Sequence, residues 1–156
     1  MDNSSKDDLT VANIGRIIKN TVSVVKSEGS NVQTVGRIDI EKYRCITDEI
    51  ATDEVIITPE RIQHIEERHP GDYEQFVKYI ADILANPDYI LEANKPNTGV
   101  ILKEIEENGE KFKVILRVKV ESDPAEYRNS ILSFWQIGET TWKKNVKNKK
   151  ILYKRE

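Results

Sequence analysis

The chain has 156 residues, 38% of them apolar and 33% charged, which is typical of one globular domain with or without an arm. Its 24 Lys and Arg residues against 27 Asp and Glu residues give a formal charge of −3, so nucleic acid would have to bind through a local basic patch. The single cysteine, Cys45, excludes an intramolecular disulfide. Because the sequence shows neither a signal peptide nor about 18 consecutive apolar residues, we expect a cytoplasmic protein that does not contact membranes.

The first 36 residues differ in character from the rest. They are rich in Asn, Ser, Thr and Gly and contain only short periodic runs. The spacing of Ile14, Ile17 and Ile18 allows a short helix, and Val22-Ser23-Val24 allows a strand. We therefore predict an N-terminal arm over residues 1–36 and one domain over residues 37–156.

The domain begins with short strand patterns at residues 38–40, 43–46 and 54–57. Thr58-Pro59-Glu60 then combines a hydroxyl N-cap, a proline at the first helical position and an acid at the positive end of the helix dipole. These residues predict a helix that runs to about His69, because Pro70-Gly71 cannot continue it.

A second helix is predicted to begin at Asp72, which has Gln75 three residues later as in a capping box. Apolar residues at helical spacing carry it to Asn86-Pro87-Asp88, where it ends.

After the second helix the apolar residues alternate with a period of two. Strands are predicted over residues 89–91, 99–105, 111–120, 130–137 and 150–153. A two-residue turn at Asn108-Gly109 would place Lys103 opposite Val114 and Glu104 opposite Lys113, with Lys103 on an apolar face of the sheet. This order of elements predicts an α+β fold with two N-terminal helices packed on a four- to five-stranded antiparallel sheet.

The only two histidines, His64 and His69, lie on the first helix. Their spacing of five residues puts them on different helix faces, which disfavours a zinc site. His69 ends the core-facing stripe, near the place where the hairpin puts Lys103. The two groups could share a catalytic hollow, or His69 could cap the helix while Lys103 extends to solvent, and position alone favours the second interpretation.

Three further groups are candidates for binding. Ser133 and Trp135 share one face of their strand and could bind a phosphate and stack a base, although both could also serve packing. Arg117 lies on a strand where apolar and cationic residues alternate. The segment 142–155 carries seven Lys and Arg residues and no acid, as expected of a polyanion-binding surface or of a solvated strand and turn.

Several motifs are absent from the sequence: a glycine-rich phosphate loop, a GxSxG elbow, a CxxC pair and a paired-Asp cluster for magnesium. We therefore expect any catalysis to need neither a metal nor another cofactor. RNA cleavage fits this expectation, because the substrate supplies its own nucleophile, the ribose 2′-hydroxyl. The protein then needs only a group such as histidine to move protons and cations to stabilise the phosphorane.

Seven segments together form a characteristic set. They are Ile38-Asp39-Ile40-Glu41-Lys42-Tyr43, Thr52-Asp53-Glu54-Val55-Ile56-Ile57-Thr58, His64-Ile65-Glu66-Glu67-Arg68-His69-Pro70, Asn86-Pro87-Asp88-Tyr89-Ile90, Lys103, Ile131-Leu132-Ser133-Phe134-Trp135 and Lys150-Ile151-Leu152-Tyr153-Lys154. This set resembles the nuclease-like domains that phages and mobile elements carry, within the barnase–EndoU–colicin–RelE superfamily. The resemblance covers about residues 36–154.

The resemblance implies an α+β fold with a metal-independent endoribonuclease site between helices and sheet. Arg68 and His69 match the family's helix-end motif, Lys103 its strand lysine, and Ser133 a position where the family usually has Thr. His69 would then move the proton, Arg68 and Lys103 would stabilise phosphate charge, and Ser133 would orient a phosphate oxygen.

The remaining functional expectations concern substrate and partners. His64, Arg117 and Trp135 would contact the RNA, for which tRNA is one candidate. A toxin of this kind would also have an antitoxin or immunity protein as a partner. The rival interpretation is a non-catalytic RNA- or protein-binding module of a phage or conjugative element that keeps the fold without the reaction.

Overall fold

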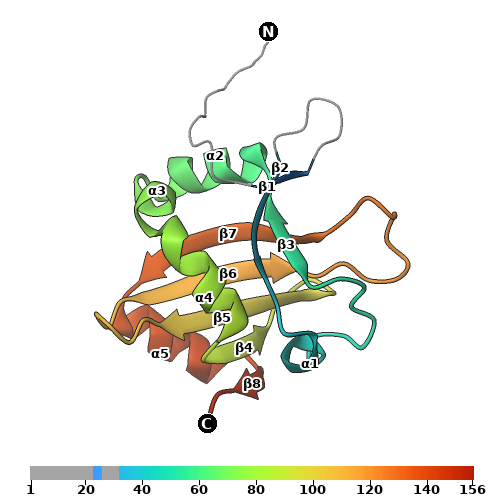
Figure 1. Cartoon of the computed structure of the whole chain (residues 1–156). Helices are drawn as coiled ribbons and strands as arrows, with labels where there is room; N and C mark the ends of the chain where they lie inside the picture. Colours follow the sequence, from blue (N-terminus) through green and yellow to red (C-terminus); the bar gives the residue numbers. More distant parts are fainter. Residues whose placement is uncertain (1–22, 26–31) are drawn as a thin grey trace, which may run out of the picture.

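The computed structural model describes residues 23–25 and 32–156, so the helix considered near residue 14 lies outside the described residues. The elements in chain order are β1 (Ser23–Val25), β2 (Val32–Arg37), α1 (Ile40–Tyr43), β3 (Glu54–Ile57), α2 (Pro59–Arg68), α3 (Asp72–Phe76), the 3₁₀ helix η1 (Val77–Tyr79), α4 (Ile80–Ala85), β4 (Tyr89–Glu92), β5 (Thr98–Glu104), β6 (Lys111–Arg117), β7 (Asn129–Ile137), α5 (Glu139–Asn148) and β8 (Ile151–Lys154). The predicted α+β class is confirmed (Figure 1).

The described strands form one open sheet in the order β1-β2-β3-β7-β6-β5-β4-β8. Every neighbouring pair is antiparallel except β3 and β7, which run parallel. The predicted sheet of four to five antiparallel strands is thus too small and lacks this parallel pair. The reason is that β2, which falls in the predicted arm, pairs with β3, and β3 then joins the far edge of β7.

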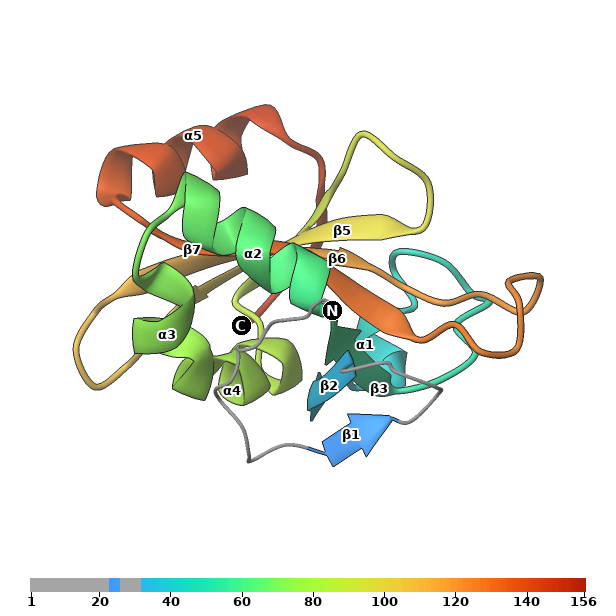
Figure 2. The same cartoon turned by 90° about the horizontal axis from the view of Figure 1, so that it is seen from above.

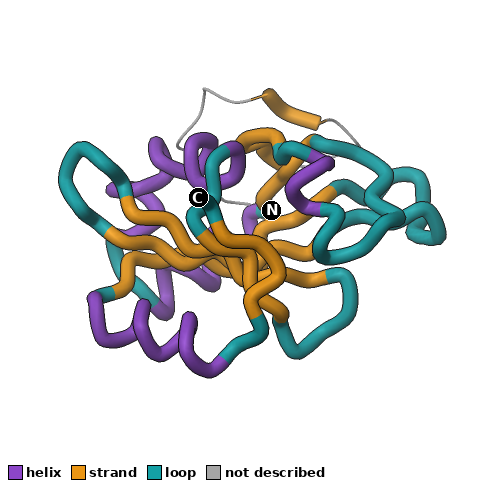
Figure 3. Tube along the Cα trace, turned by 90° about the horizontal axis from the view of Figure 1, so that it is seen from below, coloured by secondary structure: helices purple, strands orange, loops and turns teal. Residues whose placement is uncertain are grey.

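Helices cover both faces of this sheet, as Figure 3 shows. On one face, helices α2, α3 and α4 supply Ile65, Phe76 and Ile83 to the main core, which includes Phe112 and Phe134 of the sheet. On the opposite face, Trp142 and Val146 of α5 pack on a second cluster of buried strand residues: Leu91, Val100, Leu102 and Ile137. We call these the α4 face and the α5 face.

Helix α5 occupies part of the basic segment 142–155, for which a solvated strand and turn was one of the two interpretations. Gly138 stands at its N-cap, Glu139 lies in its first turn and Lys147 in its last, in agreement with the helix dipole. Its buried side is narrow, because all residues of α5 except Trp142, Asn145 and Val146 are exposed. Because lysines lie between and beside them, these few apolar residues do not give a recognisable helical period in the sequence.

The first predicted helix is confirmed. Helix α2 begins after Thr58, whose hydroxyl accepts a hydrogen bond from the Arg61 amide. The second predicted helix is divided into α3, η1 and α4. Its N-cap is Gly71 at φ +84°, and the Asp72 carboxylate accepts a hydrogen bond from the amide of Gln136 on β7 instead of capping the helix.

The strand predicted at residues 43–46 is absent. Residues Ile40–Tyr43 form helix α1 instead, because the Asp39 side chain accepts a hydrogen bond from the Glu41 amide at the helix N-terminus. Among the described residues, no helix has the length and apolar character that a membrane span requires.

The β5–β6 hairpin is present, but its register differs from the predicted one by two residues. Lys103 pairs with Phe112, and Glu104 pairs with Lys111. The loop is longer than two residues because the Asn108 side chain accepts a hydrogen bond from the Glu110 amide and Gly109, at φ +72°, donates to the Ile105 carbonyl. A shift of two preserves the faces of a strand, so Lys103 still points to the apolar α4 face, as predicted.

Candidate functional site

The imidazole of His69 stacks on the indole of Trp135. The ring centroids are 4.8 Å apart and the planes differ by 3°. His69 is the C-cap residue of α2, and α2 packs along the edge of β7. Figure 2 shows why this edge is open to α2: β3 pairs with β7 only near its start, and α2 lies above the rest of the strand, between α4 and α5.

Backbone hydrogen bonds hold His69 in this position. Its amide donates to the Ile65 carbonyl, which closes the last turn of α2, and its carbonyl accepts from the Asp72 amide. The Gly71 amide donates to the Glu66 carboxylate. Together with the bond from the Gln136 amide to the Asp72 carboxylate, these contacts fix the α2–α3 corner to β7. These contacts place the backbone of His69, and the stacking on Trp135 is the contact that orients its ring.

Lys113 completes a cluster around the indole. Its Nζ lies 5.3 Å from the centroid of the Trp135 ring, a cation–π contact. Burial, followed by the charge of Lys149, lowers the pKa of the Lys113 ammonium below its ordinary value. We call His69, Trp135 and Lys113 the indole cluster. Ionisable groups whose pKa is shifted by burial and a neighbouring charge are frequent at functional sites.

Ser133 lies on the same face of β7 as Trp135. It pairs with Ile115 while Trp135 pairs with Lys113, two residues further along β6. The sequence left open which face of β7 meets the helices. Phe134 belongs to the main core and Trp135 packs with the α5-face cluster, so Ser133 and Trp135 are directed to the α5 face.

A pocket of about 230 Å³ adjoins the indole cluster on the α5 face. Its floor consists of residues from three strands, among them Val100, Ile115 and Leu132. Lys113 lines the pocket and also contacts the indole, so it is the residue that the two places share. Lys95 and Lys149 line the pocket as well.

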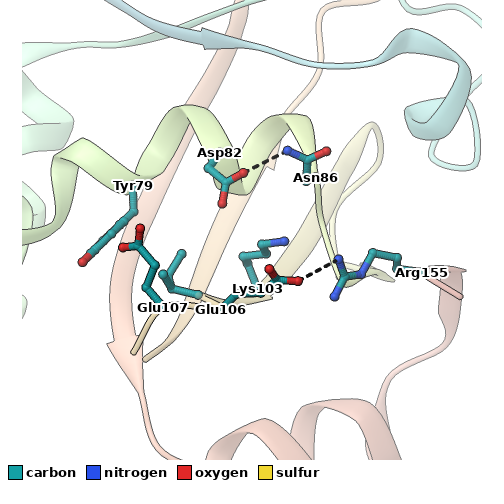
Figure 4. Close-up of a pocket in the computed structure, with 8 residues that line it drawn as sticks. Tyr79, Asp82, Asn86, Lys103, Glu106, Glu107 and Arg155 are labelled. Atoms are coloured by element: carbon teal, nitrogen blue, oxygen red, sulfur yellow. Dashed lines mark hydrogen bonds and ion pairs between the residues drawn. The ribbon is translucent and has the colours of Figure 1, made fainter. Parts of the chain in front are cut away.

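Lys103 lies in a different place. It is 3% exposed, and its Nζ is 3.7 Å from an Asp88 carboxylate oxygen, which also accepts the ion pair from Arg155 Nε at 3.0 Å. It lines a pocket of about 520 Å³ beneath α4, together with Asp82 and Asn86 (Figure 4). The surroundings of Lys103 are therefore those of a buried ion pair.

The structure does not bring Lys103 and His69 together. Lys103 is on the α4 face of β5, and β6 separates β5 from the β7 residue on which His69 stacks. Trp135 moreover points to the opposite face of the sheet. The expected shared hollow is therefore not formed. The prediction failed because strand alternation assigns Lys103 to a face of the sheet but does not tell which helices cover that face.

The other predicted residues are found in varied settings. Arg117 forms an ion pair with Asp123 through both guanidinium nitrogens, which organises the loop after β6. Hydrogen bonds from Arg117 and from the Val120 amide hold the pKa of Asp123 below its ordinary value. Arg68 is the exposed last residue of α2, next to His69, and His64 is half-buried on the same helix.

Lys113 is the residue that the sequence pattern does not single out. Its signal is the alternation of Lys113, Ile115 and Arg117 on one face of a strand, but nothing in that pattern separates a cation at a pocket from one in solvent. Within the described part of the chain, no cluster of three or more His, Cys, Asp or Glu side chains could hold a metal ion.

Comparison with known proteins gives one match. The model of the family described as "phage-Barnase-EndoU-ColicinE5/D-RelE like nuclease2" matches residues 30–154, most of the chain. Neither the curated proteins nor the solved structures contain a significant match. The matched region begins just before β2 and includes every later helix and strand.

Proposed function

The chain belongs to the phage-Barnase-EndoU-ColicinE5/D-RelE like nuclease2 family, and from this membership we propose that it is a metal-independent endoribonuclease whose site is the indole cluster. A nuclease family implies a nucleic acid substrate. The choice of RNA rests on the residues available, because cleavage through the 2′-hydroxyl needs only proton transfer and charge stabilisation.

In the proposed reaction the ribose 2′-oxygen attacks the adjacent phosphorus. The bond from O2′ to phosphorus forms, the bond from phosphorus to O5′ breaks, and the products are a 2′,3′-cyclic phosphate and a 5′-hydroxyl. One group must remove the 2′-hydroxyl proton and one must protonate O5′. We assign one of these transfers to His69, since an imidazole is suited to proton transfer near neutral pH.

Lys113 is assigned to stabilise the charge that develops on the phosphorane. A half-buried ammonium acts on such a charge more strongly than one in bulk water, because the local dielectric is lower. This is the role that the family resemblance gave to Lys103. Arg68 and Ser133 keep their proposed roles, contacting the phosphate from the helix end and from β7.

One observation carries the proposal: a histidine and a pKa-lowered lysine contact the same indole. Among the described residues, neither ring nitrogen of His69 makes a hydrogen bond, since its contact with Trp135 uses the ring face. The nitrogens are thus available to a substrate.

The test is incubation of the protein with tRNA and total RNA in EDTA between about pH 5 and 8. We expect fragments that end in 2′,3′-cyclic phosphate. His69→Ala should slow cleavage by about 100-fold or more, the usual share of general acid–base catalysis. Gln63→Ala, an exposed change on the same helix, is the matched control and should cleave normally. A folded wild-type protein that cuts no RNA at any pH in this range would refute the proposal.

The non-catalytic binding module remains the second candidate, and one observation favours it. Two of the residues that the resemblance joins in one site are held apart, His69 against Trp135 of β7 and Lys103 against Asp88 on the α4 face, as expected if the reaction has been lost. Under this alternative the wild type binds RNA without cutting it, and His69→Ala leaves the affinity nearly unchanged.

A toxin role adds a partner to the ribonuclease proposal. A cell that makes an active ribonuclease acting on its own RNA needs an antitoxin or immunity protein. Expression of the wild type alone should then arrest growth, while His69→Ala should be tolerated. Normal growth with active wild-type protein would argue against such a partner.

A further inference from the structure

The pocket beside Lys113 concentrates positive charge. Its lining includes three lysines from separate segments: Lys95 after β4, Lys113 on β6 and Lys149 at the C-terminal end of α5. No Asp or Glu residue lines it. The fold therefore gathers three cations around a small hollow and leaves their charge uncompensated.

These lysines differ from two other cations of the sheet, Lys103 and Arg117, in having no acidic partner among the described residues. Lys103 and Arg117 are ion-paired with Asp88 and Asp123. In contrast, none of the three pocket lysines forms an ion pair with a carboxylate in the described part of the chain, and the pKa of Lys113 is lowered partly by repulsion from Lys149. An anion in the pocket would relieve that repulsion.

We propose that this pocket binds a second phosphate of the same RNA strand, next to the phosphate that is cleaved at the indole cluster. The inference rests on the proposed function and adds the direction in which the substrate extends, along the α5 face. Lys113 borders both places, so it lies between the two phosphates.

The size of the pocket selects among anions. A volume of about 230 Å³ is smaller than the 300–1,000 Å³ of sites that enclose a drug-sized ligand. It suits a phosphate with part of its ribose and excludes a whole enclosed nucleotide. The apolar floor of Val100, Ile115 and Leu132 can contact the sugar while the ammonium groups contact the phosphate oxygens.

The test compares substrates that differ by one phosphate. Equimolar pools of ribodinucleotides and ribotrinucleotides without terminal phosphates present one and two phosphates. The wild type should cleave the trinucleotide pool with a kcat/KM about tenfold higher, the effect expected of one charge-assisted contact. Lys95→Ala should remove most of this gain and leave dinucleotide cleavage nearly unchanged, and Lys149→Ala should remove the gain as well. Lys144→Ala, an exposed lysine of α5 outside the pocket, should keep it.

A binding measurement makes the result independent of cleavage. The affinity of each protein for the corresponding 2′-deoxy pools, measured by fluorescence anisotropy at several salt concentrations, should fall in the two pocket variants. The slope of log K against log salt should shrink by about 0.7 for each phosphate that the variant protein no longer binds. Free inorganic phosphate at millimolar concentration should compete only weakly, because it cannot also occupy the indole cluster.

The outcomes separate the two proposals. If no pool is cleaved but the pocket variants bind more weakly and with less salt dependence, the ribonuclease proposal fails and the second phosphate site stands. If cleavage occurs but dinucleotides and trinucleotides react equally well, the pocket proposal is wrong. It is also wrong if Lys144→Ala weakens binding as much as Lys149→Ala does, because the effect is then one of overall charge.

Discussion

The buried pair of Lys103 and Asp88 allows a quantitative test of the fold around β5. Asp88→Asn removes the charge that faces Lys103 while keeping the shape of the side chain, and the amide oxygen can still accept the hydrogen bond that Asp88 takes from the Glu104 amide. Lys103 is 3% exposed, so its ammonium would be left buried without a counter-charge. Breaking a buried ion pair from one side costs about 3–5 kcal/mol.

Arg155 adds little to this cost. It contacts the same Asp88 oxygen as Lys103, but it is exposed, and ion pairs with an exposed partner contribute about 0–1 kcal/mol. We therefore expect Asp88→Asn to lower the free energy of unfolding by about 3 kcal/mol. In a Lys103→Met background the same change should cost about 1 kcal/mol or less, since the buried charge is already gone.

Urea unfolding of the wild type, both single variants and the double variant completes a double-mutant cycle. The expected coupling between the two positions is about 2 kcal/mol. Additive effects of the two substitutions would refute the reasoning, because they would mean that Lys103 reaches solvent and does not depend on Asp88.

Three further predictions concern other parts of the molecule. Lys113→Met should raise the thermal unfolding midpoint at pH 7, because it removes an ammonium whose pKa burial lowers; calorimetry measures this, and a lower midpoint would contradict it. Asp123→Asn should destabilise the fold at pH 7 and progressively less as the pH falls below the ordinary Asp pKa: hydrogen bonds from Arg117 lower the pKa of Asp123, so its stabilisation is complete above the unfolded value and is lost as the pH falls through the lowered one, which urea unfolding at several pH values checks. Gly99→Ala should cost about 1 kcal/mol, the low end of overpacking, since a Cβ there would lie 2.6 Å from Ile46 Cδ1 and that methyl would have to move; an unchanged urea midpoint would contradict this.

Local signals in the sequence predict those elements that local contacts decide. Helix α2 follows from the Thr58 cap and Pro59, both of which act within one turn. The hairpin lies at Asn108 and Gly109 as predicted, but the number of loop residues depends on where the Asn108 side chain bonds. Both outcomes reflect interactions across only a few residues, where the sequence pattern is informative.

The candidate site could be predicted only in part, because it is assembled from distant segments. His69 and Trp135 each stand out in the sequence, yet their stacking depends on β3 leaving the edge of β7 open to α2. The role of Lys113 depends on Lys149, which α5 brings to the same pocket. Because of its lysines, helix α5 cannot be recognised from the sequence pattern. The position of Lys149 at the pocket could therefore not be predicted either.

Two lysines on opposite faces of the sheet distinguish the two possible places of the reaction. The cleavage rate of Lys113→Met and of Lys103→Met on the same RNA, under conditions where both are folded, decides which face holds the reacting phosphate. Placing the site at the indole cluster predicts a loss of about 100-fold or more for Lys113→Met and near wild-type cleavage for Lys103→Met. A large loss with Lys103→Met and normal cleavage with Lys113→Met would put the reaction on the α4 face and contradict the account.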